Sequence, residues 1–434
     1  MRKAAAVAVL VLLAAAAAFC EVDRVPRPEF QSGYQLPEVQ TPAPRSVFLE
    51  YADVAALAVA LAAAGWLALR ARSREGIFVL GALSIAYFGF FRKGCVCPIG
   101  SIQNVALSLA DSSYVLPVTV VAFFTFPLVA TLLTGRVFCA GVCPFGALQD
   151  LVIVKPLRLP RWLSVPLGFL PVIYLGLAVL FAATGADFVV CRFDPFVSFF
   201  RGGGRAEILA LGACVLVLGT VVARPYCRFV CPYGVVLKSL SRLSLIHTTI
   251  SPDSCVQCRL CEEACPFDAI RPAQPQAAAP PSPREKRAFR AALAALPLLV
   301  ALGAFAGFLL SPWLAQVHPT VRLARQVLNE DAGLEKTTTL ESDTFRSRQT
   351  TTAELVGQAE RIRRSFAWAS PLFGGFVMLV LAAGFLGSFL RQGNTEHQPD
   401  RGECFSCGRC FSYCPREHLR LRQRAAGKTR GGGP

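Results

Sequence analysis

Long apolar runs dominate the hydropathy pattern of the chain. A run of about 18 or more apolar residues is typical of a membrane-spanning helix. Eight segments reach or approach that length, at 4–20, 48–69, 76–91, 115–134, 165–184, 207–223, 291–312 and 368–390. The first of them also fits a signal anchor or a cleaved signal peptide. The pattern predicts an all-α polytopic membrane protein with about eight transmembrane helices.

The polar segments between these runs divide the chain into five regions. An N-terminal signal anchor with a short periplasmic segment covers 1–47, and a transmembrane core covers 48–240. The first cytoplasmic polar region covers 241–287. A transmembrane hairpin follows at 288–390, with a periplasmic loop at 313–367. The second polar region, with a basic tail, covers 391–434.

Charge is distributed unevenly over these segments. The chain carries 44 Lys and Arg against 28 Asp and Glu, a formal net charge of +16. With the N-terminus inside, the cytoplasmic segments hold 28 of the basic residues and 11 acidic ones. This bias follows the positive-inside rule and favours a bacterial inner membrane, with both polar regions in the cytoplasm. Because the excess flanks the membrane, it predicts contact with membrane lipid and excludes nucleic acid as a partner.

Two cysteine runs in the polar regions have the ferredoxin spacing C-x2-C-x2-C-x3-C-P. They comprise Cys255, Cys258, Cys261 and Cys265 in the first region, and Cys404, Cys407, Cys410 and Cys414 in the second. Zinc sites use two CxxC pairs or mixtures of Cys and His, which fits this spacing less well. The two runs therefore predict two [4Fe–4S] clusters.

The two ferredoxin runs are separated by two predicted spans, so both end on the same side of the membrane. In a two-cluster ferredoxin, three cysteines of a run bind one cluster and the fourth ligates the other. We therefore expect one ferredoxin-like domain split by the transmembrane hairpin. Cys414 would complete the cluster of the first run, and Cys265 would complete the cluster of the second.

A second cysteine pattern repeats inside the membrane core. RVFCAGVCPFGALQD (136–150) and RPYCRFVCPYGVVLK (224–238) share an Arg, C-x3-C-P, an aromatic residue and Gly. Their cysteines are Cys139, Cys143, Cys227 and Cys231, at the expected cytoplasmic ends of two spans. These four thiols either hold a further cluster or serve as packing thiols or redox-active pairs. A degenerate third copy, RKGCVCPIGSIQNV (92–105), shortens the cysteine spacing to C-x-C.

Counting spans places Cys95, Cys97 and Cys191 on the outer side, opposite the other cysteines. Thiols in an oxidising compartment normally form a disulfide, which is one interpretation. The other is an outer metal or iron–sulfur site whose fourth ligand is Cys20, solvent or a partner's residue. Arg192 and Asp194, in CRFDPF (191–196), are charged residues expected near membrane depth. They either serve a quinone site or pair with each other.

Together these motifs resemble the NosR/NapH/CcoG group of membrane-bound polyferredoxins, and NosR in particular. The resemblance rests on the two C-x3-C-P repeats, both ferredoxin runs, CRFDPF, HPTVRLA (318–324) and PDRGECFSCGRCFSYCP (399–415). It covers about residues 75 to 418 and implies electron transfer between the quinone pool or cytoplasm and periplasmic or membrane partners, including a flavin- or haem-bearing protein. NosR carries an outer flavin-binding domain before its spans, for which residues 21–47 are too short.

The sequence favours a membrane-bound iron–sulfur protein that relays electrons across the inner membrane to or from a respiratory or metalloenzyme-maturation partner. We expect an electron carrier rather than a stand-alone enzyme. Two alternatives stay open. One is a copper-ion or quinone reductase, and the other is a redox-sensing or assembly factor in which the clusters regulate.

Overall fold

The computed structural model describes residues 46–94, 97–203, 205–250, 255–272, 283–335, 337–347, 351–387 and 397–430. The expected first span at 4–20, Cys20 and Cys95 lie outside these residues. Among the described residues, five helical segments are long and apolar enough to cross a membrane, or six if one bent pair counts as a span. All five lie at predicted spans: Val47–Ala71, Arg74–Phe91, Trp162–Ala183, Pro283–Ala315 and Thr352–Gly387.

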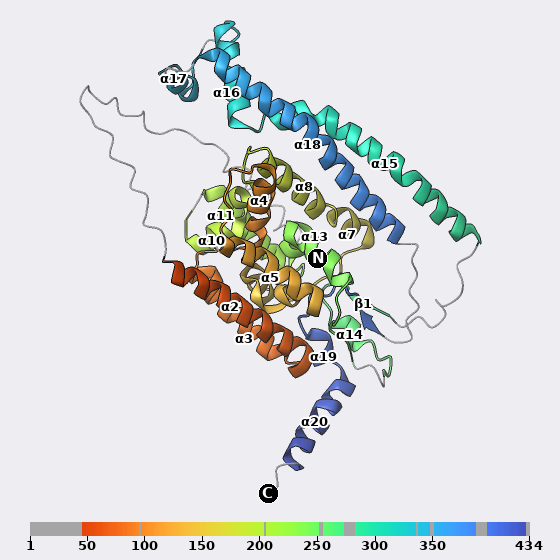
Figure 1. Ribbon diagram of the computed structural model, residues 1–434. Helices are drawn as coiled ribbons and strands as arrows, with labels where there is room; N and C mark the ends of the chain where they lie inside the picture. Colours follow the sequence, from red (N-terminus) through yellow and green to blue (C-terminus); the bar gives the residue numbers. More distant parts are fainter. Residues whose placement is uncertain are drawn as a thin grey trace.

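The membrane core consists of helices with short connections (Figure 1). Its first elements are α2 (Val47–Trp66), η1 (Leu67–Ala71), α3 (Arg74–Ser84), η2 (Ile85–Phe91), α4 (Pro98–Ala110) and α5 (Val118–Thr134). They are followed by η3 (Phe138–Val142), α6 (Pro144–Leu151), α7 (Arg161–Leu167), α8 (Leu170–Ala183), α9 (Val189–Phe193) and α10 (Pro195–Arg201). The last are α11 (Ala206–Gly219), α12 (Pro225–Phe229) and α13 (Pro232–Arg242). The η elements are π-helical turns.

Two expected spans differ from their prediction. The span expected at 207–223 is the 14-residue helix α11, which joins α10 at an angle of 106°. The residue after α10, Gly202, adopts a left-handed φ of 62° that ends the helix. The span expected at 115–134 is α5, a 17-residue apolar helix that ends at Thr134 as predicted but begins only after its N-cap Pro117. Both helices are therefore shorter than the apolar runs that predicted them.

A long hairpin of α15 (Pro283–Ala315) and α18 (Thr352–Gly387) runs along one side of the core, next to α8 (Figure 1). Its connection carries α16 (Pro319–Asp331) and α17 (Leu340–Ser347). His318 is a helix-end residue there, because its ring nitrogen accepts a hydrogen bond from the Thr320 amide at 3.1 Å and caps α16. The hairpin leads the chain from one polar region to the other.

The polar regions form a small domain at the other end of the hairpin. It contains α14 (Leu260–Glu263), α19 (Arg409–Ser412) and a two-stranded antiparallel sheet, followed by α20 (Pro415–Arg430). In the sheet, β1 (Ile270–Arg271) pairs with β2 (Gln398–Pro399), so that Ile270 lies opposite Pro399. Phe267 and Phe405 pack with their ring centroids 4.7 Å apart. Residues 140 positions apart thus build one domain, whose buried aromatic residues join the hydrophobic core of the membrane helices.

Candidate iron–sulfur centres

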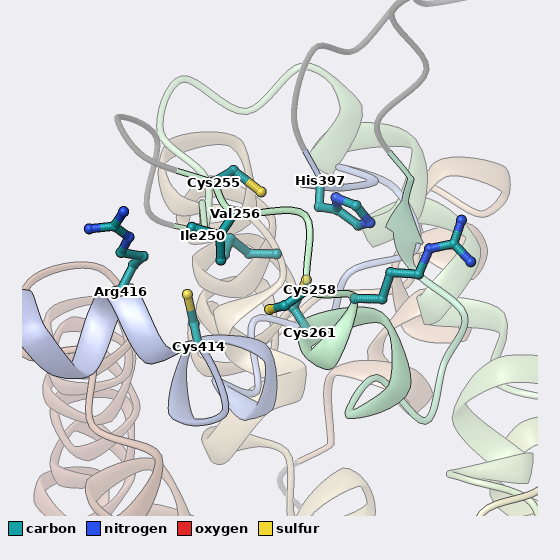
Figure 2. A pocket seen from close by; sticks show the side chains of 9 residues that line it. Ile250, Cys255, Val256, Cys258, Cys261, His397, Cys414 and Arg416 are labelled. Carbon is teal, nitrogen blue, oxygen red and sulfur yellow. The ribbon is translucent and has the colours of Figure 1, made fainter.

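A pocket in the small domain brings together four cysteines from both polar regions (Figure 2). Its lining includes the first three cysteines of one run, Cys255, Cys258 and Cys261, and the last cysteine of the other, Cys414. Figure 2 shows their sulfur atoms around a common space. Ile250, Val256, Arg259, His397 and Arg416 complete the wall. We call these four cysteines the first ferredoxin set; Cys258 is exposed and Cys261 is buried.

The second ferredoxin set comprises Cys404, Cys407, Cys410 and Cys265. Cys404 and Cys410 each interact electrostatically with Cys407 and with Cys265. Cys265, Cys407 and Cys410 are buried, in contrast to the solvent-exposed Cys258. Cys261 and Cys410 also interact electrostatically, so the two sets are neighbours.

Left-handed backbone residues turn the chain around the middle cysteine of each run. Gln257 and Arg259 flank Cys258 with φ of 53° and 61°. Ser406 and Gly408 flank Cys407 in the same way, with φ of 54° and 79°. Such conformations are uncommon for residues other than glycine and usually serve a functional geometry. Here they curl each loop so that its thiols converge.

The donor chemistry of these sets fits an iron–sulfur cluster. The first ferredoxin set joins three thiols of one C-x2-C-x2-C run to the last thiol of the other run, which is the ligand pattern of a two-cluster ferredoxin. Burial raises the pKa of the Cys261 thiol to about 11, so a cation such as iron is needed to stabilise its thiolate at neutral pH.

The exchange of the fourth cysteine leads to a prediction. We expect Cys414→Ser to weaken the cluster of Cys255, Cys258 and Cys261, and Cys265→Ser to weaken the cluster of the second run, because each removes a ligand from the opposite set. Electron paramagnetic resonance of the two reduced variants measures the losses. Cys214→Ser, in α11, is the control thiol. Each variant losing the signal of its own run would contradict the exchange.

Four further cysteines meet between the small domain and the membrane helices. This core set comprises Cys139, Cys143, Cys227 and Cys231, which interact electrostatically with one another. Gln149 lies beside it, donating from Nε2 to Cys227 Sγ at 3.2 Å and accepting from the Tyr226 amide at 3.0 Å. Cys143 and Cys231 each precede a proline that begins a helix, α6 or α13. The two repeats thus contribute two cysteines each to one set.

The arginine that opens each repeat crosses to the other repeat. Arg224 donates to the Cys139 carbonyl oxygen at 2.5 Å, and a Cβ on Gly146 would lie 3.6 Å from its Nη1. Arg136 correspondingly lies 3.7 Å from the Cβ position of Gly234. A Cβ would be in ordinary contact with the guanidinium at both places, and the tighter contacts are with backbone: 3.0 Å to the Cys139 carbonyl oxygen at Gly146 and 3.3 Å to the Cys227 carbonyl oxygen at Gly234. Both arginines are common to the two repeats in the sequence. Only the structure shows that each contacts the other repeat.

The same two arginines connect the core set with the second ferredoxin set. Arg136 donates to the Gly402 carbonyl oxygen at 3.1 Å and lies over the Phe405 ring, 4.0 Å from its centroid. Arg136 Nη2 is 4.0 Å from Cys139 Sγ. Arg224, which is fully buried, interacts electrostatically with both Cys139 and Cys407. Both guanidinium groups therefore lie between the two thiol sets.

Asp150 holds the small domain against the core, a role that sequence reasoning missed. This buried carboxylate on α6 forms ion pairs with Arg74, Arg224 at 3.4 Å and Arg409 at 3.2 Å. Arg409 belongs to the second ferredoxin run, and Arg74 also donates to the Cys407 carbonyl oxygen at 3.0 Å. The contact fixes the second ferredoxin set beside the membrane helices.

The structure places Cys97 near the core set. Cys97 precedes α4, which packs against α5, α8 and α13, and it interacts electrostatically with Cys231 of the core set. The side of the membrane on which the expected outer cysteines lie stays a prediction. Cys191 lies beside α4, because a Cβ on Gly100 would be 3.2 Å from its Sγ. Cys95 lies outside the described residues.

Asp194 and Arg192 have different surroundings. Arg192 is exposed and pairs with Asp187 at 2.7 Å. Asp194 is buried, with Oδ1 accepting from the Phe196 and Val197 amides and Oδ2 from the Tyr226 hydroxyl at 2.7 Å. The interpretation that these two residues pair with each other is thus not supported, and their place in a quinone site stays a prediction.

Comparisons with known proteins agree with the donor sets. A family model described as a 4Fe–4S binding domain matches residues 116–166 and 206–250, which contain the whole core set. A second model with the same description matches 248–271, which contains the first ferredoxin run. The regulatory protein NosR of Stutzerimonas stutzeri is 26% identical over 46% of this chain and 30% of its own length. Protein NirI of Paracoccus denitrificans is 32% identical over 32% of this chain and 22% of its own length.

The chain is similar to NosR and NirI, and two parts of it match 4Fe–4S binding domains.

The chain is also similar to YccM of Escherichia coli, whose description assigns it to electron transport. The two are 28% identical over 39% of this chain and 52% of YccM. The chain spans about half the length of the first curated relatives that it matches. No solved structure gives a significant match. The name of YccM refers to electron transport, and the two family models refer to 4Fe–4S binding.

Proposed function

We propose that this protein relays electrons across a bacterial inner membrane, between a soluble redox partner at the ferredoxin sets and a redox protein on the opposite side. One observation carries the proposal: the thiol sets form a continuous series from an exposed position into the membrane core. The series begins at the exposed Cys258 and passes the buried Cys407 and the core set to reach Cys97.

Each step of the series is supported by a contact between neighbouring sets. Cys261 interacts with Cys410, which joins the two ferredoxin sets. Arg136 and Arg224 lie between the second ferredoxin set and the core set. Cys231 interacts with Cys97. Since the hydrocarbon core is about 30 Å thick, clusters at one surface alone are too far from a partner on the other side, and intermediate sites shorten the steps.

The buried arginines favour conduction over an isolated structural role for the core set. A positive charge next to a cluster stabilises its reduced, more negative state, since hydrogen bonds and net charge around the sulfurs set the reduction potential. Arg224 is fully buried, so solvent screens its charge little. We infer that Arg136 and Arg224 keep the second ferredoxin set and the core set at potentials that allow electron exchange.

The test uses full-length protein, purified anaerobically and inserted into liposomes that enclose ferricyanide. Dithionite added outside should reduce the ferredoxin clusters and then the enclosed ferricyanide, whose bleaching is followed optically. Cys231→Ser should abolish most of this bleaching while the ferredoxin clusters still become reduced. Cys214→Ser, which changes a thiol outside the sets, should bleach at the parental rate. Reduced clusters with no bleaching in the parental protein would refute the relay and favour a sensor.

A further inference from the structure

Four helices of the core begin in the same way, one more than the sequence repeats indicate. Each has a proline at its first turn and a potential ligand at the position before it. These N-cap residues are Cys97, Cys143, Asp194 and Cys231, with ψ of 116°, 115°, 114° and 112°. Asp194 thus occupies the place of a cysteine in a fourth copy, Val189 to Phe199. The copy escapes a sequence search because its second cysteine is replaced by a carboxylate.

The side chains at these four positions are held differently. Asp194 Oδ1 accepts hydrogen bonds from the Phe196 amide at 2.9 Å and the Val197 amide at 3.2 Å. Cys97, Cys143 and Cys231 form no side-chain cap hydrogen bond. The four copies therefore share the extended N-cap backbone and the proline that follows it.

A pair of glutamines extends the correspondence to the first cysteine of each copy. Gln149 accepts from the amide of Tyr226 and donates to the following residue, Cys227. Gln103, six residues after Cys97 just as Gln149 is six after Cys143, accepts from the Val190 amide at 2.7 Å. Val190 directly precedes Cys191. Gln103 is fully buried, and its Nε2 has no hydrogen-bond partner among the described residues. A buried amide without a partner is costly and indicates an absent acceptor.

The three potential ligands lie together. Cys97 interacts electrostatically with both Asp194 and Cys191, and Cys191 Sγ lies against α4 at Gly100. Asp194 is 2% exposed, and its carboxylate accepts three hydrogen bonds, from the Phe196 and Val197 amides and the Tyr226 hydroxyl. A carboxylate has about four acceptor positions, so one is left for a further ligand. The Tyr226 hydroxyl joins Asp194 to the residue next to Cys227, so this group adjoins the core set.

We propose that Cys97, Cys191 and Asp194 hold an iron–sulfur cluster, with Asp194 as an oxygen ligand and Gln103 as a donor to a cluster or thiolate sulfur. Carboxylates are established ligands of iron in proteins. Held by these residues, such a cluster would accept one electron from the core set, with one Fe(III) reduced to Fe(II), and would donate it to the outer redox protein, with no bond formed or broken. The direction of electron transfer in this proposal rests on the proposed relay function. The presence of the cluster does not.

The test compares Asp194→Asn and Asp194→Cys in the full-length protein, purified anaerobically. Asparagine caps a helix about as well as aspartate but lacks the carboxylate charge. Asp194→Asn should therefore lose the iron and sulfide of one cluster, as should Cys97→Ser, while the ferredoxin clusters keep their absorption. Asp194→Cys should retain the iron and shift the resonance signal of that cluster toward all-thiolate ligation. Asp187→Asn, in the same loop, is the control.

Parental iron and sulfide in Asp194→Asn would overturn the proposal and leave Asp194 as a helix cap alone. Equal losses in Asp194→Asn and Asp194→Cys would also overturn it, because a structural role predicts no rescue by cysteine. The liposome measurement separates the site from the relay. Loss of this cluster without any change in ferricyanide bleaching would leave the ligand assignment standing and remove its role in transfer.

Discussion

Gly374→Val is expected to separate the hairpin helices α15 and α18 and to lower the iron content of the ferredoxin sets. A Cβ on Gly303 would lie 2.6 Å from the Gly374 carbonyl oxygen, and a Cβ on Gly374 would overlap the Gly303 carbonyl oxygen. Gly303 and Gly307 form a small-x3-small pattern that allows two membrane helices to approach closely. Because backbone atoms are in the way, a side chain cannot be accommodated by a rotamer change.

We expect the substitution to destabilise the folded protein by roughly 3 kcal/mol or more, at the upper end of overpacking effects. The hairpin returns the second cysteine run to the first, so the fourth ligand of each ferredoxin set depends on it. Thermal unfolding in detergent and iron content are the measurements. Gly384→Val is the matched control on the same helix, because a Cβ there meets nothing within 4 Å. Equal stability of the two variants would contradict the role of this crossing.

Asp150→Asn is expected to loosen the small domain from the membrane core. The substitution keeps the size of the side chain but removes the charge that compensates Arg74, Arg224 and Arg409, of which Arg224 is fully buried. Leaving a buried charge without its partner typically costs about 3–5 kcal/mol. The second ferredoxin set should then become accessible to solvent and lose iron to a chelator faster than the parental protein.

The charge of Asp150 is present under all ordinary conditions. Burial alone would raise its pKa, but Arg224, Arg74 and Arg409 outweigh that effect and hold the pKa at about 2. An aspartate in the unfolded chain titrates near about 3.9. The stabilisation is therefore complete above roughly pH 4 and disappears only as the pH falls toward 2. Unfolding and chelator release are accordingly compared at pH 7.

The control for Asp150→Asn is Asp187→Asn, which removes an exposed ion pair with Arg192. Exposed pairs contribute about 0–1 kcal/mol, so this variant should behave like the parental protein. If both variants released iron at the same rate, Asp150 would not be the residue that anchors the domain.

Some features followed from the sequence because they depend on local order. Apolar runs predict spanning helices wherever no backbone break intervenes, as in α15 and α18. The ferredoxin spacing predicts the donor chemistry, because three cysteines with two residues between successive ones can bind one cluster from a single loop. The exchange of Cys265 and Cys414 stays a prediction, but it too could be stated in advance, since two spans return the chain to the same side.

Other features were decided by the tertiary structure alone. The crossing of Arg136 and Arg224, the three arginines on Asp150 and the neighbourhood of Cys97 and Cys231 join residues about 80 to 260 positions apart. No local pattern encodes such pairs, because they result from how the helices pack. The place of Asp194 among the N-cap cysteines has the same origin. A carboxylate and a thiol look unrelated in a sequence, and only the shared backbone geometry before each helix makes them comparable.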